Sequence, residues 1–138
     1  MDVVYADTSA LVKLVAPAPE SVALRAWLAE RTWVVSDLHR TELRRAARRT
    51  GAGTEAVLAR AEALLAELDT IRLDGSVFDA AGRLEPVALR SLDALHLAAA
   101  LRLGPDLAGL VAYDDRLIAA AHRHEITTWS PGKNVSVN

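Results

Sequence analysis

Acidic side chains recur in this sequence at the ends of apolar runs, where several of them could meet in the folded chain. Asp7 ends the run VVYAD, and Asp114 follows the run GLVAY. Glu42 comes little more than one helical turn after TWVVSD, and Asp93 lies near the start of the apolar helix RSLDALHLAAALRL. A carboxylate on an apolar helix is costly unless something compensates for it, and a shared cation would do so.

The residue types favour a hard divalent cation over zinc. Carboxylates brought together without a cation repel one another, so that one or more must take up a proton. Mg²⁺ or Mn²⁺ removes this repulsion and prefers oxygen ligands, whereas the chain has no cysteine and no paired histidine motif to favour zinc. Such a site suits phosphoryl chemistry, in which one or two ions activate water and stabilise the leaving oxygen.

Short apolar runs alternate with helical patterns, which predicts a parallel sheet covered on both faces, an α/β fold. Thr8 or Ser9 is available to cap the first helix. In open parallel sheets, ligands bind beyond the carboxyl ends of the strands, so this architecture would bring the acids together. The expected strands are 3–7, 32–37, 70–74, 109–113 and 126–129, and the expected helices are 8–16, 20–31, 38–50, 54–68, 75–84, 91–103 and 114–125.

Length and composition indicate one domain spanning 1–138, with a polar tail over 130–138. The hydrophobic fraction of 51% and the net charge of -2 suit a globular protein, and the chain has no cysteine for disulfides. The N-terminus carries an acid where a secretion signal would be basic, and no apolar run approaches the roughly 18–20 residues of a membrane helix. We therefore expect a cytoplasmic protein without a membrane partner.

Four segments resemble, in order and spacing, the signature regions of PIN-domain ribonucleases, and in particular the VapC toxins of bacterial toxin–antitoxin pairs. They are YADTSALVKL, SDLHRTEL, RSLDALHLAAAL and AYDDRLIAAA, and the resemblance runs from about residue 3 to about residue 129. It implies a PIN-like three-layer α/β/α sandwich with a mostly parallel sheet, a homodimer, and hydrolysis of RNA by a metal-activated water. It also implies a VapB-type antitoxin that inhibits the enzyme by occupying its active-site groove.

The resemblance extends to single residues. Thr8 and Ser9 match the small hydroxyl residues that lie by the metal and the substrate phosphate. One departure is Ala112, because the family usually has Thr or Ser at this position, two residues before its last acid. Asp115 is also acidic, and the sequence does not decide whether it or its neighbour faces the metal. The acidic quartet that binds Mg²⁺ or Mn²⁺ and carries catalysis in this family corresponds here to Asp7, Glu42, Asp93 and Asp114.

Each acid also has a purely structural interpretation. Asp7 could cap a helix, Asp93 could be an ordinary first-turn acid, and Asp114 or its neighbour is expected to cap the last long helix. Glu42 alone would more simply pair with Arg45 at i+3. It is the four acids together, in the family's order, that indicate a shared metal site.

The basic residues add candidates for substrate binding. The arginine-rich helix 38–50 is most simply a solvated face, but its acid Glu42 makes Arg45 and Arg49 candidates for contact with RNA phosphates. Arg90 could neutralise the site or bind substrate, and the sequence leaves both open.

The histidines and tryptophans are expected to be structural. His96 follows Asp93 by one helical turn and is expected to be a satisfied structural histidine rather than a catalytic base. The two histidines at 122–124 point to different sides of a helix, so the surface is their expected place, and His39 is expected there too. Core or dimer packing is the expected role of Trp27 and Trp33.

Other function classes fit less well. Phosphoaspartate phosphatases and receiver domains also place an aspartate after their first strand. The phosphatase pattern needs a second acid two residues later, where this chain has Ser9. A receiver needs adjacent acids at that strand and a lysine after its last strand, whereas Lys133 lies in a Pro/Gly tail. A PIN-like module that binds RNA or protein without cleavage is the alternative, although the full acidic set argues against it.

Overall fold

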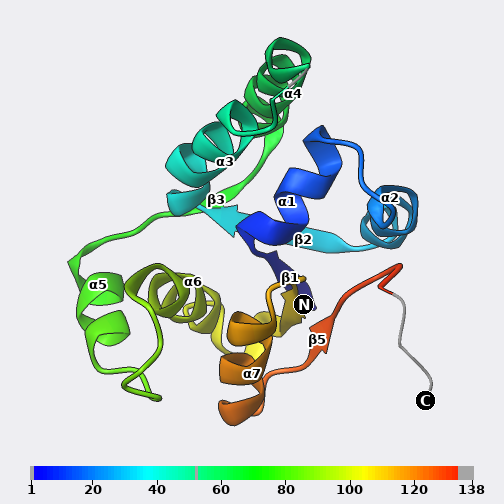
Figure 1. Ribbon diagram of the computed structural model, residues 1–138. Helices are drawn as coiled ribbons and strands as arrows, with labels where there is room; N and C mark the ends of the chain where they lie inside the picture. Colours follow the sequence, from blue (N-terminus) through cyan, green and yellow to red (C-terminus); the bar gives the residue numbers. More distant parts are fainter. Residues whose placement is uncertain (1, 52, 134–138) are drawn as a thin grey trace.

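The computed structural model describes residues 2–51 and 53–133, and its strands form one five-stranded sheet (Figure 1). The strands lie in the order β3-β2-β1-β4-β5, and every neighbouring pair is parallel. All their carboxyl ends therefore meet at one edge of the sheet, where ligands bind in open α/β folds. Their bounds are β1 Val3–Ala6, β2 Thr32–Ser36, β3 Thr70–Ile71, β4 Leu107–Val111 and β5 Thr128–Trp129.

Helices cover both faces of the sheet and complete the predicted α/β/α sandwich (Figure 1). One face is covered by α1 Thr8–Val15, α2 Ser21–Ala29, α3 Leu38–Arg48 and α4 Thr54–Glu67. The other face is covered by α5 Gly75–Gly82, α6 Ser91–Leu101 and α7 Asp115–Arg123, with a short 3-10 helix at Gly104–Asp106 before β4. The α/β class and the three-layer architecture are confirmed.

The central strand β1 shows why this sheet is buried on both faces. All four of its residues are buried, because helices lie above and below them. Val4 and Ala6 belong to the core formed with α1–α4, whereas Tyr5 belongs to the core formed with α5–α7. A strand covered on both faces reads as a continuous apolar run, which is how VVYA appears in the sequence.

Every predicted strand and helix is present, with shifts at the ends. β3 retains only Thr70 and Ile71 of the predicted 70–74, and β4 begins earlier than predicted, at Leu107. The predicted tail is described as far as Lys133, and 134–138 lie outside the described residues. None of the helices described is long and apolar enough to cross a membrane.

Of the caps that the sequence offers for the first helix, Asp7 is confirmed, whereas Thr8 and Ser9 are wrong. Neither Thr8 nor Ser9 caps α1, since both already belong to the helix. β1 passes into α1 without a linker, so the residue at the junction, Asp7, is the N-cap and accepts a hydrogen bond from the backbone N–H of Ala10. The same residue therefore ends the strand, starts the helix and belongs to the acidic quartet.

Candidate active site

The carboxyl edge of the sheet gathers all four acids of the predicted quartet. Asp7 directly follows β1, Asp114 follows β4, Glu42 lies on α3 after β2, and Asp93 lies in the first turn of α6. Burial, and after it the charges of Asp114 and Glu42, raise the pKa of Asp93. Burial raises the pKa of Asp7 to about 6, and the charge of Asp114 acts in the same direction. Within the quartet, Asp114 thus lies near enough to Asp7 and Asp93, and Glu42 near enough to Asp93, for the charges to repel.

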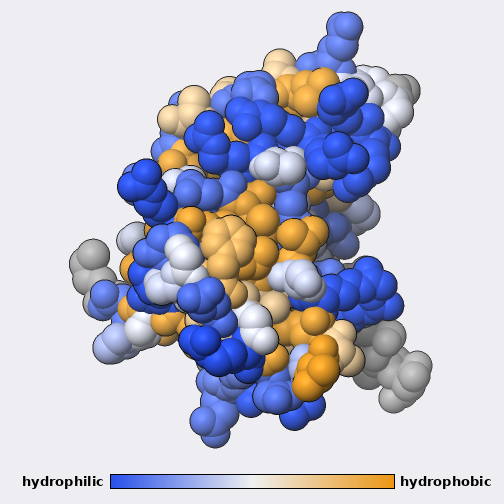
Figure 2. Space-filling view, turned by 90° about the vertical axis from the view of Figure 1, so that its left-hand side faces the viewer, coloured by the Kyte–Doolittle hydropathy of each residue, from blue (hydrophilic) through white to orange (hydrophobic). Residues whose placement is uncertain are grey.

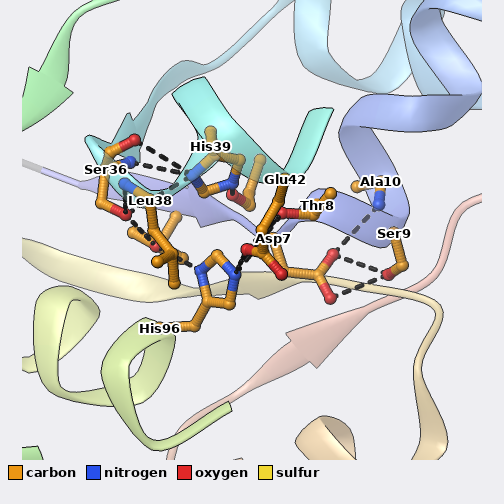
Figure 3. A network of polar contacts seen from close by, with 11 residues as sticks. Asp7, Thr8, Ser9, Ala10, Ser36, Leu38, His39, Glu42 and His96 are labelled. Carbon is orange, nitrogen blue, oxygen red and sulfur yellow. Dashed lines mark hydrogen bonds and ion pairs between the residues drawn. The ribbon is translucent and has the colours of Figure 1, made fainter. Parts of the chain in front are cut away.

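Asp7 is held by hydrogen bonds at the start of α1 (Figure 3). The Ser9 hydroxyl lies 2.7 and 2.8 Å from its two carboxylate oxygens, and the Ala10 N–H donates to Oδ1 at 3.0 Å. Ser9 Oγ also accepts the backbone N–H of Tyr113 at 2.9 Å. The first and the last acidic segment are therefore tied together next to a carboxylate that is only 3% exposed.

Glu42 turns from α3 toward α1 and α6 rather than along its own helix (Figure 3). Its Oε1 accepts hydrogen bonds from Thr8 Oγ1 at 2.9 Å and from His96 Nε2 at 2.5 Å. Burial would raise the pKa of Glu42, but the donors His96 and Thr8 outweigh it and hold that pKa below its usual value. Among the residues described, no ion pair joins Glu42 to Arg45, so the i+3 pair that was the structural alternative for Glu42 is not formed.

His96 connects the quartet to the core of the sheet. It is buried and hydrogen-bonded, as predicted for a structural histidine, but one partner is a carboxylate of the quartet. A carboxylate only accepts, so Nε2 carries the proton that it donates to Glu42. Nδ1 lies 2.7 Å from the Tyr5 hydroxyl, which donates in turn to Ser36 Oγ at 3.0 Å. A chain of buried polar groups, His96, Tyr5 and Ser36, thereby holds Glu42 on the side that faces the core.

The prediction that His39 lies at the surface is wrong, because its side chain is fully buried. Nδ1 accepts the Ser36 N–H at 3.1 Å, and Nε2 donates to the Ala6 carbonyl at 2.7 Å. Burial lowers the pKa of His39 to about 3, so this ring is neutral near pH 7. The signal was present in the sequence: His39, Leu43 and Ala47 follow one another at a spacing of four and form the buried face of α3.

The remaining histidines and the tryptophans contribute no group to the quartet. His122 is exposed as predicted, and His124 is half-buried with Nε2 2.7 Å from the Glu85 carbonyl. Trp27 packs against Trp129 with ring centroids 5.1 Å apart, and Trp33 packs against the same core, as predicted for packing residues.

Asp93 and Asp114 stand at the starts of two helices. Asp114 caps α7 by accepting the backbone N–H groups of Arg116 and Leu117, as predicted for one of the adjacent acids. Asp115 is exposed and pairs with Lys133 at 2.8 Å, so Asp114 is the member of the pair whose charge reaches the quartet. Asp93 is half-buried in the first turn of α6, where backbone N–H groups favour an anion.

The chemistry of the quartet fits a hard cation, although no cation site is preformed. Among the described residues, no three Asp, Glu, His or Cys side chains are arranged as a ready-made metal site. Nevertheless, the charge of Asp114 raises the pKa values of Asp7 and Asp93, and the charge of Glu42 raises that of Asp93. Oxygen is the ligand that Mg²⁺ and Mn²⁺ prefer. Ala112 is buried and supplies no hydroxyl there; the nearby Thr8 and Ser9 hydroxyls are already bonded to the carboxylates of Glu42 and Asp7.

The sequence interpretation missed two arginines near the quartet. Arg116 and Arg123 line, together with Arg90 and Asp93, a hollow of about 330 Å³. The spacing offered a signal, because Arg123 follows Arg116 by seven residues, or two helical turns, on the helix that begins after Asp114. Arg90, whose role the sequence left open, lies beside Asp93; burial raises the pKa of that acid and the charge of Arg90 opposes the rise.

Of the arginines that the sequence favoured, Arg45 lies on α3 and Arg49 is its C-cap. Arg45 and Arg49 are exposed, and in the described part of the chain neither side chain forms a hydrogen bond or ion pair. Arg44, by contrast, pairs with Glu62 through Nε at 2.6 Å. Arg45 and Arg49 are therefore available for an external anion, which agrees with the prediction but does not test it.

Comparison with known proteins gives a consistent family. The sequence matches the PIN domain over residues 4–123. It is 48% identical over 122 residues to the ribonuclease VapC46 of Mycobacterium tuberculosis, covering 88% of this chain and 92% of that protein. It is 40% identical over 134 residues to the ribonuclease VapC47 of the same species, covering 94% of this chain and 97% of that protein.

A solved structure supports the fold independently of close sequence identity. The toxin VapC20 of Mycobacterium tuberculosis, described as cleaving the sarcin-ricin loop, superimposes with a TM-score of 0.68 at 18% identity. The match covers 85% of this chain and 94% of that one. With the acidic quartet at the sheet edge and near-complete coverage of its relatives, this chain belongs to the PIN-domain family, among proteins of the VapC type.

Proposed function

We propose that this protein is a divalent-cation-dependent endoribonuclease that hydrolyses RNA phosphodiester bonds. The observation that carries the proposal is the meeting of four carboxylates from four separate segments at the carboxyl edge of the sheet. The ribonucleases VapC46 and VapC47 support it, because they are similar over nearly the whole chain. The single-domain organisation over 1–138 is part of the same proposal.

The quartet would hold Mg²⁺ or Mn²⁺ and form the catalytic centre. When bound, the cation supplies an activated water and stabilises the leaving oxygen. Thr8 and Ser9 orient two of the carboxylates through the hydrogen bonds described above. His96 holds Glu42 from the side of the core. The four ligands are Asp7, Glu42, Asp93 and Asp114.

The groups that meet the substrate are basic and hydroxylic. Arg45 and Arg49 would position the RNA strand through its phosphates, because both are exposed and without partners in the described structure. Thr8 and Ser9 would lie next to the scissile phosphate. Fixed guanidinium groups stabilise the charge that develops on a phosphate during its hydrolysis.

We further propose a VapB-type antitoxin as the inhibitory partner and the cytoplasm, where RNA is available, as the place of action.

A homodimer is supported by an apolar surface between α5 and α6. Phe78 lines this surface and is 52% exposed, and Leu92, which is 50% exposed, follows the lining residue Ser91 on α6. Figure 2, which looks onto the side where α5 lies, shows apolar side chains in the middle of this face. Exposed apolar patches of this kind mark contacts with other proteins. Leu92→Glu is expected to convert a dimer to a monomer in analytical ultracentrifugation.

The decisive experiment is incubation of total cellular RNA with the purified chain in Mg²⁺, in Mn²⁺ and in EDTA. Discrete fragments that disappear with EDTA and with Asp93→Asn are the expected result, and they lead directly to the target sequence. Absence of cleavage under either cation, in protein shown to be free of a bound antitoxin, would favour the non-cleaving binding module instead.

A further inference from the structure

A basic hollow adjoins the quartet on the side of α6 and α7. Arg90 lies at the start of α6, and Arg116 and Arg123 lie on α7. Their three guanidinium groups are exposed, and in the described part of the chain none of them forms a hydrogen bond or ion pair. The described lysines, by contrast, are engaged: Lys13 pairs with Glu20, and Lys133 pairs with Asp115. This part of the surface thus presents unused positive charge.

The hollow has an apolar part, called its floor here, and an acid of the quartet also lines it. The floor consists of Pro86 and Leu89 from the loop before α6 and of Ala119 and Ala120 from α7. Asp93 belongs to both the hollow and the quartet, so the two are continuous. The volume of about 330 Å³ lies at the lower end of small-molecule sites, which span about 300–1,000 Å³.

We propose that this hollow is a substrate subsite that binds one nucleotide of single-stranded RNA next to the scissile phosphate. The assignment rests on the proposed function for the identity of the ligand. Arg116 and Arg123 bind the phosphates on either side of the nucleotide, and Arg90 closes the rim beside Asp93. The unpaired base lies on the apolar floor. Proteins bind single-stranded nucleic acid through positively charged grooves that follow the backbone, and a base taken out of its stack is held between aromatic or apolar side chains.

The first test measures RNA binding without catalysis. Binding of a short fluorescein-labelled single-stranded RNA of random sequence is followed by fluorescence anisotropy in EDTA, at several salt concentrations. The double variant Arg116→Ala/Arg123→Ala is expected to bind on the order of tenfold more weakly. The slope of log K against log salt is expected to fall by about 0.7 for each phosphate that the protein no longer neutralises. Arg48→Ala is the control, because Arg48 is an exposed, unpartnered arginine on α3 away from the hollow.

A second variant tests the floor without removing an arginine. Ala119 lines the hollow and is exposed on α7, so Ala119→Glu adds a carboxylate inside the hollow at a position where glutamate is a good helix former. It is expected to weaken RNA binding at least as much as the double arginine variant. Ala63→Glu, at an exposed position on α4, adds the same charge elsewhere and is expected to leave binding nearly unchanged.

The outcomes separate this inference from the proposed function. Variants in the hollow that bind RNA as well as Arg48→Ala and Ala63→Glu would overturn the subsite, even if the wild type cleaves RNA. A wild type that does not cleave RNA, but binds it in a manner that depends on Arg116 and Arg123, would refute the nuclease and leave the subsite standing.

Discussion

The two halves of the acidic quartet are built differently. Asp7 and Glu42 are held by side-chain donors: Ser9 bonds to the first, and Thr8 and His96 bond to the second. Asp93 and Asp114 stand at helix starts, and only the Asp114 carboxylate has a hydrogen bond in the described structure, from the backbone of α7. Asp7 and Glu42, called the deep half here, are tied to the folded core by these hydrogen bonds. Asp93 and Asp114, called the shallow half, are positioned by helix geometry alone.

This difference separates the energetic roles of the four acids. A buried carboxylate costs folding free energy that hydrogen bonds only partly return, as the raised pKa of Asp7, caused mainly by burial, indicates. Asp93 is half-buried and Asp114 is exposed, so their carboxylates cost less than the buried one of Asp7, and each can interact favourably with a helix dipole. Replacing a deep acid should therefore change both stability and activity, and replacing a shallow acid should change activity alone.

The largest expected effect tests the shallow half. Asp93→Asn should lower RNA cleavage more than about 100-fold, because even the outer-shell partners of metal ligands contribute about 10–100-fold. Its free energy of unfolding should stay within about 1 kcal/mol of wild type, since the helix-dipole interaction that is lost is offset by relief of the burial and like-charge repulsion that raise the pKa of Asp93. Cleavage assays with thermal denaturation measure both. Asp115→Asn is the matched control, because Asp115 is an exposed acid paired with Lys133, and this variant should cleave RNA at the wild-type rate. An Asp93→Asn protein that cleaves RNA as fast as this control would refute the assignment of Asp93 as a metal ligand.

The deep half predicts a pH-dependent stability with a defined sign. The pKa of Asp7 is raised by burial to about 6 in the folded chain, against about 3.9 in an unfolded one. Between these values the folded state binds more protons than the unfolded state, so in EDTA this residue lowers stability as the pH rises from about 4 to about 6. Asp7→Asn keeps the helix cap and removes the charge. It should be more stable than wild type at pH 8, by at most about 3 kcal/mol, and equally stable near pH 4.

Thermal denaturation in EDTA at both pH values provides the measurement. If Asp7→Asn is less stable than wild type at pH 8, the ionised carboxylate stabilises the fold. That result would contradict the inference that the buried carboxylate of Asp7 costs folding free energy. Addition of Mg²⁺ should stabilise the wild type and not Asp7→Asn, because only the former retains the complete ligand set.

His96 connects the deep half to the core, and its replacement should act through the metal. His96→Phe removes the donor to Glu42 and should raise the Mn²⁺ concentration needed for half-maximal cleavage about 10–100-fold. His96→Gln, whose amide can donate to Glu42, should recover part of this loss. Titration of the initial cleavage rate with Mn²⁺ distinguishes positioning from a purely structural role, since the latter would leave the metal requirement unchanged. His122→Gln, on the surface of α7, is the control.

The sequence predicts the framework of this comparison but not the difference between its halves. Element order follows from apolar runs and helix periodicity, which are local properties, and each expected strand and helix is present. The position of the acids follows from parallel topology, because strand ends must meet at one edge. The partner of Glu42 could not be predicted, since His96 comes from a helix 54 residues later in the chain.

Two other errors have the same physical origin. His39 lies in an arginine-rich stretch and therefore reads as a surface residue, although its spacing with Leu43 and Ala47 marks the buried face of α3. Arg116 and Arg123 share one face of α7 by their spacing of seven, but only the packing of α6 against α7 places that face beside Asp93. Local composition is a poor guide where tertiary contacts decide which side of a helix is used.

The smallest expected effect is that of the arginines on and next to α3, and it tests whether the RNA strand runs past the deep or the shallow half of the quartet. Arg45→Ala or Arg49→Ala should raise the KM for RNA only about two- to fivefold, because each exposed ion pair contributes less than about 1 kcal/mol. Arg44→Ala is the control on the same helix, since Arg44 is already paired with Glu62. Loss of the α3 arginines should thus weaken binding less than loss of Arg116 and Arg123 together. The reverse order would place the strand along α3, over the deep carboxylates, and would make the deep half the side that meets the substrate.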